Sequence, residues 1–265
     1  MGLDVAKRLS ETGDWQVNII GRNQQRGIET MSSLANTIYH QADVRDYKQL
    51  ADVYETIYNK THRLDFVFAN AGIAGTTDFF EANSETGIPP EPCLDQVHIN
   101  LDGIMYTSYL AMHYFRRSPD STKGKRSLIL TSSIGGLYPC VLSPVYTATK
   151  HAIVGFTRSI GKKLWAEGIR VNTICPGVVK TALLIDELQS FFPDEILIPL
   201  EVVTELVLEL LSGNSMTDAR EVSVPANEMH SRALLITGHN FHFIDQPEIH
   251  DEVGKLTYAA MMGDV

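Results

Sequence analysis

The sequence predicts an α/β fold in which helices cover both faces of a mainly parallel, doubly wound sheet. Short apolar runs alternate with longer stretches of helical period, which is the pattern of βαβ units. Two of the runs, Leu64–Ala69 and Ser127–Thr131, are apolar almost without interruption, as expected for strands buried on both sides. The 265 residues contain no Pro/Gly/Ser-rich linker, so one domain is expected over residues 1–265.

The predicted elements alternate along the chain. The strands are the short apolar runs at Gln16–Ile20, Thr37–Gln41, Leu64–Ala69, Ser127–Thr131, Arg170–Ile174 and Ala233–Thr237. The helices are the longer periodic stretches at Leu3–Glu11, Gln24–Ala35, Tyr47–Asn59, Leu94–Phe115, Tyr146–Glu167 and Glu201–Leu211.

Composition excludes several classes of protein. A net charge of −10 disfavours a nucleic-acid surface, which needs clustered Lys and Arg. The cysteines are too few and too scattered for a disulfide framework or a metal site, and we interpret them as reduced: Cys93, Cys140 and Cys175. No metal site is expected either at the histidines near the C-terminus, which lack acidic or cysteine partners at ligand spacing: His230, His239 and His242.

The chain shows no targeting or membrane segment. No stretch reaches the roughly 20 apolar residues of a membrane helix, and the first residues lack the apolar region of a secretory signal. We therefore expect a cytoplasmic protein without a membrane span.

The chemistry of the chain centres on Tyr146 and Lys150, four residues apart in Tyr-Thr-Ala-Thr-Lys. On a helix these residues share a face, so the ammonium can stand beside the phenol and lower its pKa. A tyrosine tuned in this way can exchange a proton with an alcohol or a carbonyl near neutral pH. Ser133, which follows a strand, could hold the substrate oxygen. A helix start with a surface lysine is the alternative reading of this motif, and the rest of the chain decides between them.

Further motifs stand in a fixed order along nearly the whole chain: Asp43-Val44, Asn70-Ala71-Gly72, Asn100, Ser133, Tyr146, Lys150, Pro176-Gly177 and Thr181. Because these motifs follow one another in this order, the sequence resembles the short-chain dehydrogenase/reductase family. Residues 144–158 and 174–181 look most like the branch that contains 15-hydroxyprostaglandin dehydrogenase. The resemblance implies a Rossmann-like fold and hydride transfer between a nicotinamide dinucleotide and a carbon bearing oxygen.

The resemblance also implies a role for each catalytic residue. Tyr146 would be the general acid and base, Lys150 would lower its pKa and hold the nicotinamide ribose, and Ser133 would orient the substrate oxygen. Asn100 matches the helix asparagine that anchors a water between Lys150 and solvent. The alternative for Asn100 is a polar residue that kinks a helix.

The cofactor would lie along the carboxyl ends of the strands. Small residues in the turn Asn70-Ala71-Gly72 would let a nucleotide approach the backbone, although an ordinary strand-to-helix turn would look the same. Asp43 and Val44 match the adenine contacts of the family, and a helix-entry acid is the alternative for Asp43. The residues expected beside the nicotinamide are Pro176, Val179 and Thr181.

The residue after the strand Gln16–Ile20 bears on the choice of cofactor. An acid there favours NAD, whereas an arginine can pair with the 2′-phosphate of NADP. This chain has Gly21-Arg22, so NADP(H) is expected. NAD(H) remains open because the prostaglandin dehydrogenase branch is associated with NAD, and Arg22 can also be read as surface charge.

The resemblance fails at the start of the chain. A dinucleotide-binding domain opens with a strand and a glycine-rich turn, whereas Met1-Gly2-Leu3 retains only the last glycine. In relatives that first strand lies between those matching Gln16–Ile20 and Leu64–Ala69. Its absence forfeits about five or six hydrogen bonds of ~1 kcal/mol each, comparable with the whole stability of a domain, so poor stability is expected unless something fills the gap. A truncated gene and a cofactor-poor natural relative both remain open.

Substrate and partners are less clearly indicated. A lid is expected at about 182–200, and Tyr138, Val141 and Leu142 add apolar walls that suit a hydrophobic secondary alcohol or ketone. An amphipathic core helix would look similar to that lid. By analogy with relatives, the long helices around Asn100 and after Tyr146 would pair subunits into a homodimer or homotetramer.

The leading hypothesis is thus an NADP(H)-dependent oxidoreductase of lipid or specialised metabolism. A non-catalytic scaffold or sensor with the same fold is the rival suggested by the missing glycine-rich turn. Redox-neutral elimination or isomerisation by Tyr146 alone is the third hypothesis.

Overall fold

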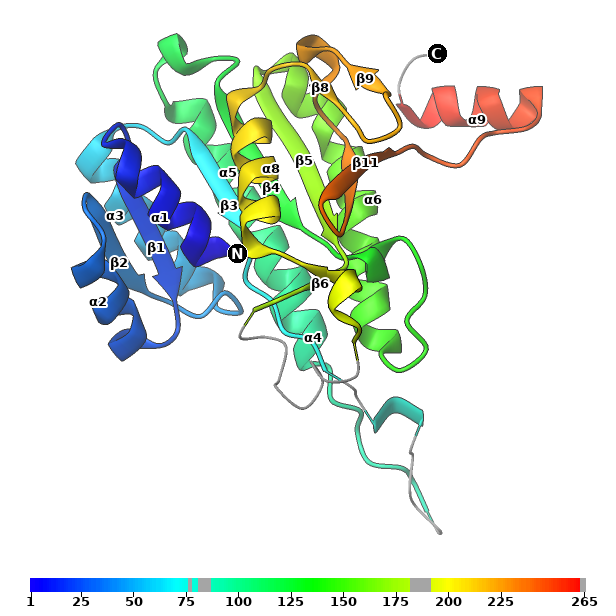
Figure 1. Ribbon diagram of the computed structural model, residues 1–265, viewed down its shortest axis with the longest axis horizontal. Coiled ribbons are helices and arrows are strands. Elements are labelled where there is room, and N and C mark those ends of the chain that lie inside the picture. The colour runs from blue at the N-terminus through cyan, green and yellow to red at the C-terminus, as the bar shows by residue number, and fades with distance from the viewer. Residues whose placement is uncertain (76–77, 81–86, 182–191, 263–265) are drawn as a thin grey trace.

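The computed structural model describes residues 1–75, 78–80, 87–181 and 192–262. A mostly parallel central sheet lies between helices on its two faces, with α1 and α8 in front of it in Figure 1 and α5 and α6 behind. The predicted α/β class is therefore confirmed.

The main sheet has the strand order β11-β10-β5-β4-β3. Its parallel members are β3 (Phe66–Ala69), β4 (Arg126–Thr131), β5 (Ile169–Pro176) and β10 (Ala233–Thr237), and β11 (Asn240–Ile244) runs antiparallel to β10. A separate parallel pair is formed by β1 (Val17–Gly21) and β2 (Thr37–Gln41). Two short pairs join β6 (Val178–Val179) to β7 (Leu197–Ile198), and β8 (Met216–Thr217) to β9 (Ser223–Val224).

The helices that surround the sheet are α1 (Gly2–Thr12), α2 (Gln24–Ser33), α3 (Tyr47–Thr61), α4 (Asp95–Val97), α5 (Gly103–Arg117), α6 (Pro144–Ala166), α8 (Leu200–Ser212) and α9 (Glu252–Met262). Local chemistry sets their ends. The Asn23 and Asp46 side chains cap α2 and α3 by accepting backbone N–H bonds. Pro144 stands at the first position of α6, where its missing N–H costs nothing. α1 ends at Gly13, whose φ of 76° suits glycine.

Two apolar layers hold the helices against the sheet. On one face, α1 and α8 pack through residues such as Leu9, Val203 and Leu206. On the other face, α3, α5 and α6 pack through residues such as Leu50, Phe115 and Ile153. Both sides of β4 are therefore covered, which is why its apolar run has no alternation.

The sheet is interrupted between β1 and β3, which do not pair with each other: in the described residues β1 pairs with β2, and β3 pairs with β4. This is the place where the sequence predicted a missing strand. Other contacts cross the break: Trp15 meets Phe66 edge to face at 6.3 Å between ring centroids, and Thr204 of α8 donates a hydrogen bond of 2.7 Å to Asp4 of α1. The poor stability expected from the missing strand stays a prediction.

A buried carboxylate ties the β8–β9 turn to the edge of the main sheet. The Asp218 side chain is fully buried and accepts bonds from the Arg220 guanidinium and from the backbone amides of Arg220, Val222 and Phe243. Burial opposes the charged form, but these bonds outweigh burial and hold the pKa of Asp218 well below its ordinary value. The carboxylate is thus a structural anchor.

Replacing Asp218 with Ala should lower the free energy of unfolding by about 2–4 kcal/mol, because buried donors lose a charged acceptor. Since the Asp218 pKa is lower in the folded than in the unfolded chain, this loss should be complete above about pH 5 and shrink as the pH falls below that. Urea unfolding of both proteins from pH 3 upward measures it. The control is Asp120→Ala, whose side chain is 88% exposed. A loss for Asp218→Ala no greater than that for the control would contradict the anchoring role.

Candidate active site

The carboxyl ends of β4 and β5 meet the start of α6 at Ser133. This residue follows β4 in extended backbone and caps the next short turn, where its Oγ accepts the N–H of Gly135 at 3.1 Å. The Ser133 hydroxyl also donates to the carbonyl of Pro176, the last residue of β5, at 3.4 Å. The side chain is buried, so its orientation is set by the two strands rather than by solvent.

α6 brings Tyr146 and Lys150 to the same place. The Lys150 side chain is buried, and its Nζ donates to the Thr131 carbonyl at the end of β4, at 2.9 Å. The same Nζ lies 5.5 Å from the centre of the Tyr146 ring, and the Tyr146 ring and the Ser133 hydroxyl both lie beside Gly135. The three residues that the sequence singled out therefore converge.

The protonation states differ from the sequence-based expectation. Burial raises the pKa of the Tyr146 phenol, and its hydrogen bond to Ser133 offsets this only in part. Burial lowers the pKa of Lys150 from 10.5 to about 8. The predicted lowering of the Tyr146 pKa is therefore wrong in this structure. The physical reason is desolvation, which acts on both groups, while the Lys150 ammonium is turned to the Thr131 carbonyl.

Asn100 lies in a π-helical turn, His98–Asp102, inside the helical run that joins α4 to α5. Its side chain accepts the N–H of Ile73 at 2.8 Å and donates to the Ile73 carbonyl at 2.9 Å, so it holds the chain that follows β3. It also donates to Thr149 of α6 at 3.4 Å. The turn widens the helix where this fully buried amide faces inward, which agrees with the reading of Asn100 as a polar residue that distorts a helix, while its role in the site stays a prediction.

The turn Asn70-Ala71-Gly72 places backbone close to the catalytic residues. A Cβ on Gly72 would lie 3.2 Å from Asn100 Oδ1 and 3.6 Å from Lys150 Nζ. Asn70 lies beside the first turn of α1, where a Cβ on Gly2 would stand 2.9 Å from Asn70 Nδ2. The amino end of α1, which carries a partial positive charge, therefore opens at the carboxyl edge of the sheet.

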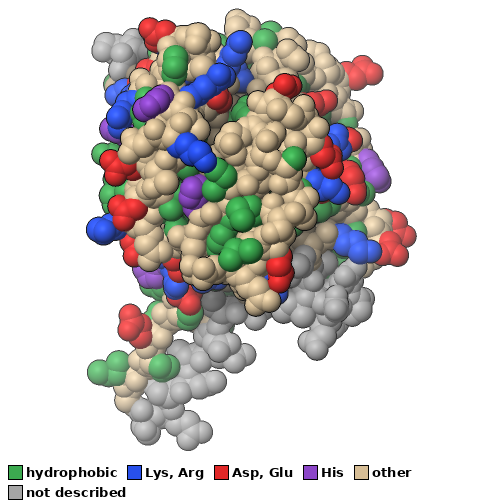
Figure 2. All heavy atoms as spheres, turned by 90° about the vertical axis from the view of Figure 1, so that its left-hand side faces the viewer, with side chains coloured by type: hydrophobic (Ala, Val, Ile, Leu, Met, Phe, Trp, Pro, Cys, Tyr) green, Lys and Arg blue, Asp and Glu red, His purple; other side chains and the backbone are tan. Residues whose placement is uncertain are grey.

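Arg22 and Asp43 lie together at the ends of β1 and β2. They line a cavity of about 400 Å³ with Gln41, Ala42 and Gln49. The Asp43 carboxylate is held by Arg45 at 2.7 Å, and its pKa is lowered chiefly by that hydrogen bond. Arg22 is only loosely paired, with Nη1 4.0 Å from Asp43 Oδ2 and a side chain that is 57% exposed. Figure 2 shows this side of the molecule, where basic and acidic side chains are interspersed.

The other residues expected to contact the cofactor lie in several different elements. Val44 packs under α5, where it limits the space at Gly103. Pro176 ends β5 beside Ser133, and Val179 lies in β6, paired with Ile198 of β7. Thr181 is half-buried and is the last described residue of its segment. Most of the expected lid, 182–191, lies outside the described residues, and the remainder contains β7.

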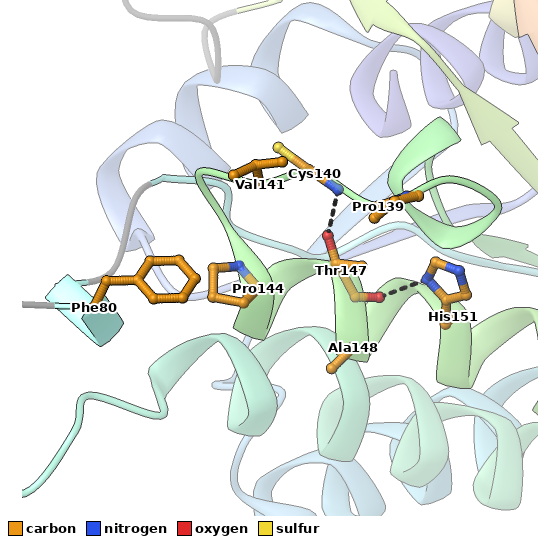
Figure 3. Close-up of a pocket in the computed structure, with 8 residues that line it drawn as sticks. All are labelled: Phe80, Pro139, Cys140, Val141, Pro144, Thr147, Ala148 and His151. Atoms are coloured by element: carbon orange, nitrogen blue, oxygen red, sulfur yellow. Dashed lines mark hydrogen bonds between the residues drawn. The ribbon is translucent and has the colours of Figure 1, made fainter.

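An apolar pocket of about 420 Å³ lies against the first turns of α6 (Figure 3). α6 contributes Pro144, Thr147, Ala148 and His151 to its lining, and the facing segments contribute Phe80, Pro139, Cys140 and Val141. The expected apolar wall residues Tyr138, Val141 and Leu142 are exposed. Of these three residues, Val141 lines the pocket.

The sequence reasoning missed three contributors to the site. Ser132 donates its hydroxyl to the Lys150 carbonyl at 2.8 Å and so fixes α6 to β4. Thr149 completes the Asn100 network, and Arg45 holds Asp43. Ser132 is adjacent to Ser133 and Arg45 is two residues from Asp43, so closeness in the sequence was a signal for both, whereas the Thr149 contact depends on how separate segments fold together.

Comparison with known proteins identifies the family of the chain. The family profile described as "short chain dehydrogenase" matches residues 1–190. The chain belongs to the short-chain dehydrogenase family. It is 41% identical over 262 residues to the short-chain dehydrogenase/reductase prx7 of Penicillium rubens, covering 95% of this chain and 93% of that protein. It is 33% identical over 177 residues to 15-hydroxyprostaglandin dehydrogenase (NAD(+)) of Homo sapiens, covering 64% of this chain and 60% of that protein.

Solved structures share the fold of this short-chain dehydrogenase. A 3-ketoacyl-(acyl-carrier-protein) reductase from Brucella melitensis, complexed with NADH, superposes with a TM-score of 0.72 at 23% identity, over 89% of this chain and 92% of the other. The structure described as ElxO with NADP bound gives a TM-score of 0.64, also at 23% identity, over 78% of this chain and 85% of the other. These likenesses concern the fold.

Two further findings concern metal sites and membrane-spanning helices. In the parts of the chain that are described, no group of three or more His, Cys, Asp or Glu side chains could hold a metal ion, and His230 instead stacks on Trp165 with ring centroids 5.0 Å apart. Within those same parts, no helix combines the length and apolar character needed to cross a membrane.

The buried Lys150 should leave a signature in the pH dependence of stability. Its pKa is about 8 in the folded chain against an ordinary 10.5, so the unfolded chain binds more protons between these values. The unfolding free energy relative to Lys150→Met should therefore rise by about 3 kcal/mol from pH 8 to pH 10.5. Urea unfolding of both proteins measures the difference, in which other titrating groups cancel. A difference that stays flat over this range would contradict a buried, pKa-shifted Lys150.

Proposed function

We propose that this short-chain dehydrogenase is an oxidoreductase that transfers a hydride between NADP(H) and a hydrophobic secondary alcohol or ketone. The observation that carries the proposal is the convergence of the Tyr146 phenol, the Ser133 hydroxyl and the Lys150 amine at the carboxyl edge of the sheet. The Penicillium relative, similar over almost its whole length, is itself named a short-chain dehydrogenase/reductase. The break in the sheet between β1 and β3 is the observation that keeps a cofactor-poor scaffold as the alternative.

The residues at this edge fit a dinucleotide. Gly72 leaves room beside Asn100 and Lys150 that a side chain would fill. The amino end of α1 is suited to a pyrophosphate, and Asp43 and Arg22 line a cavity at the adenine end. Asn70, Ala71, Pro176, Val179 and Thr181 would form the remaining wall. When bound, the nicotinamide supplies the hydride acceptor or donor.

The chain's own residues would handle the proton. Ser133, whose hydroxyl lies with the Tyr146 ring beside Gly135, would hold the substrate oxygen next to Tyr146. Burial keeps the phenol protonated at neutral pH, which is the form that donates a proton to a carbonyl oxygen. Lys150 holds the nicotinamide ribose and passes protons toward solvent through a water anchored by Asn100. The exposed apolar residues beside the site favour a hydrophobic substrate.

NADP(H) is favoured over NAD(H) by the exposure of Arg22. The guanidinium is more than half exposed and only loosely paired, so it can turn to a 2′-phosphate without breaking a strong ion pair. Asp43 does not compete, because Arg45 already holds its carboxylate. We further propose a cytoplasmic homodimer or homotetramer that pairs through α5 and α6.

Replacing Tyr146 with Phe should lower kcat by about 10²- to 10⁴-fold, because the general acid is lost while the ring still packs. Turnover of a panel of hydrophobic secondary alcohols and ketones, followed by nicotinamide absorbance, measures this. NADPH affinity, titrated by fluorescence, should not change. The control is Tyr47→Phe, which removes an exposed hydroxyl. Unchanged turnover in Tyr146→Phe would exclude the proton transfer, and product formed without a nicotinamide signal would indicate redox-neutral chemistry.

Replacing Arg22 with Ala should weaken NADPH binding about 10- to 100-fold, the value of one charge-assisted contact. NADH binding should change by less than about twofold, because NADH lacks the phosphate. Equilibrium titration of both nucleotides measures the effect, and Arg26→Ala, one turn into α2 and exposed, is the matched control. Equal losses for the two nucleotides would overturn the assignment of NADP(H).

A further inference from the structure

The Asp43 carboxylate lies between two arginines, just beyond the carboxyl ends of β1 and β2. The Arg45 guanidinium donates to Asp43 Oδ2 through Nε at 3.1 Å and through Nη2 at 2.7 Å. On the other side, Arg22 Nη1 approaches the same oxygen only to 4.0 Å. Charge-assisted hydrogen bonds are much stronger than a loose ion pair at that distance. Asp43 is therefore bound to Arg45 and only weakly attracted to Arg22.

The contact between Arg45 and Asp43 is formed within one turn of the chain. The backbone N–H of Arg45 also donates to the Asp43 carboxylate, at 3.0 Å, so the turn and the side chain bind the same group. From the other direction, Asp95 at the start of α4 lies 3.7 Å from Arg45 Nη1. The guanidinium is thus held between an acid that follows β2 and an acid that opens α4.

The neighbours of Asp43 are fixed, whereas the Arg22 side chain is not. Gln49 of α3 accepts the backbone N–H of Asp43 at 3.0 Å, and Gln41 donates to the carbonyl of Arg22 at 3.3 Å. Asp46, the other acid of the turn, is occupied as the cap of α3. The Arg22 side chain itself is more than half exposed. Its backbone is therefore anchored, while its guanidinium is free to turn.

The cavity of about 400 Å³ at this place is lined by Arg22, Gln41, Ala42, Asp43 and Gln49. Arg45 is not among the described residues that line the cavity, so it would act on a bound ligand through Asp43. The pKa of Asp43 is lowered chiefly by the hydrogen bond from Arg45, and the charge of Arg22 adds to this effect. Without Arg45, Arg22 would be the cation left to Asp43, and the two together would present no net charge to an anion.

We propose that Arg45 is a positioning residue that sets the preference for a nucleotide with a phosphate monoester on its adenosine ribose. By holding Asp43, it keeps that carboxylate from pairing with Arg22 and from repelling the phosphate. The Arg22 guanidinium can then turn to the phosphate. The inference rests on the proposed binding of NADP(H), but it does not require turnover.

A double-mutant cycle on nucleotide binding tests the inference, with NADPH and NADH as the probes. Both are titrated by fluorescence at one fixed ionic strength, because exposed charges are screened by salt. Arg45→Ala should weaken NADPH binding about 3- to 10-fold, and NADH binding by less than about twofold. In an Asp43→Asn background no carboxylate remains to pair with Arg22, so adding Arg45→Ala should change neither affinity further. Retained NADH binding also shows that each variant is folded.

Lys48→Ala is the matched control, because it removes one positive charge from the same segment. The Lys48 side chain is 86% exposed and pairs with Asp52. Both affinities should stay within about twofold of those of the unchanged protein. A selective loss of NADPH binding as large as that of Arg45→Ala would reduce the effect to overall charge and overturn the proposal.

Two further results would overturn the role of Arg45. A loss of NADPH binding that persists in the Asp43→Asn background would mean that Arg45 acts on the phosphate directly, and equal losses for the two nucleotides would mean a structural role. Arg22→Ala separates these failures from that of the proposed function. A selective loss in Arg22→Ala without one in Arg45→Ala overturns this inference alone, whereas no selective loss in either variant overturns the assignment of NADP(H) with it.

Discussion

The hydrogen bond between Lys150 and the Thr131 carbonyl is the contact on which the site depends. It gives the buried Lys150 amine a hydrogen-bond acceptor between β4 and α6, where an amine without a partner would destabilise the fold. A second bond, from Ser132 to the Lys150 carbonyl, docks the same turn of α6 on the same strand. Because both ends of Lys150 are fixed to β4, the Tyr146 ring one turn earlier has little freedom to move. The catalytic geometry is therefore a consequence of helix-to-strand docking.

The break in the sheet divides the cofactor region. Arg22 and Asp43 stand on the β1–β2 pair, whereas Ser133 and Lys150 stand on the main sheet and α6. No strand pairing joins the two parts among the described residues, so their relative position depends on α1, on the packing of α3 against α5 and on side-chain contacts such as Trp15 with Phe66. Such contacts are weaker and less directional than a hydrogen-bonded ladder. Under the proposed function, the nucleotide itself would bridge the break and stabilise the folded chain by mass action.

The sequence predicted the parallel strands and their helices well because these elements are set by local patterns. The run Thr37–Gln41 has the bounds of β2, and capping residues such as Asp46 stand where the helices begin. The convergence of Tyr146, Lys150 and Ser133 followed from spacing and motif order. The antiparallel β11 and the unpacked α9 were missed, because neither has a strong local signal. The Tyr146 pKa was predicted in the wrong direction because desolvation is a property of the assembled core, which spacing along a helix does not contain.

The shifted pKa values have a consequence for catalysis under the proposed function. At neutral pH the Tyr146 phenol is protonated, because burial raises its pKa, while Lys150, with a pKa of about 8, is mostly charged. Both protons thus lie in the site before a carbonyl arrives, as reduction of a ketone requires. Oxidation of an alcohol needs the opposite, a phenolate, and the ammonium that would stabilise it is itself lost above pH 8. Alcohol oxidation, which needs the phenolate, is therefore expected to rise with pH under the proposed function.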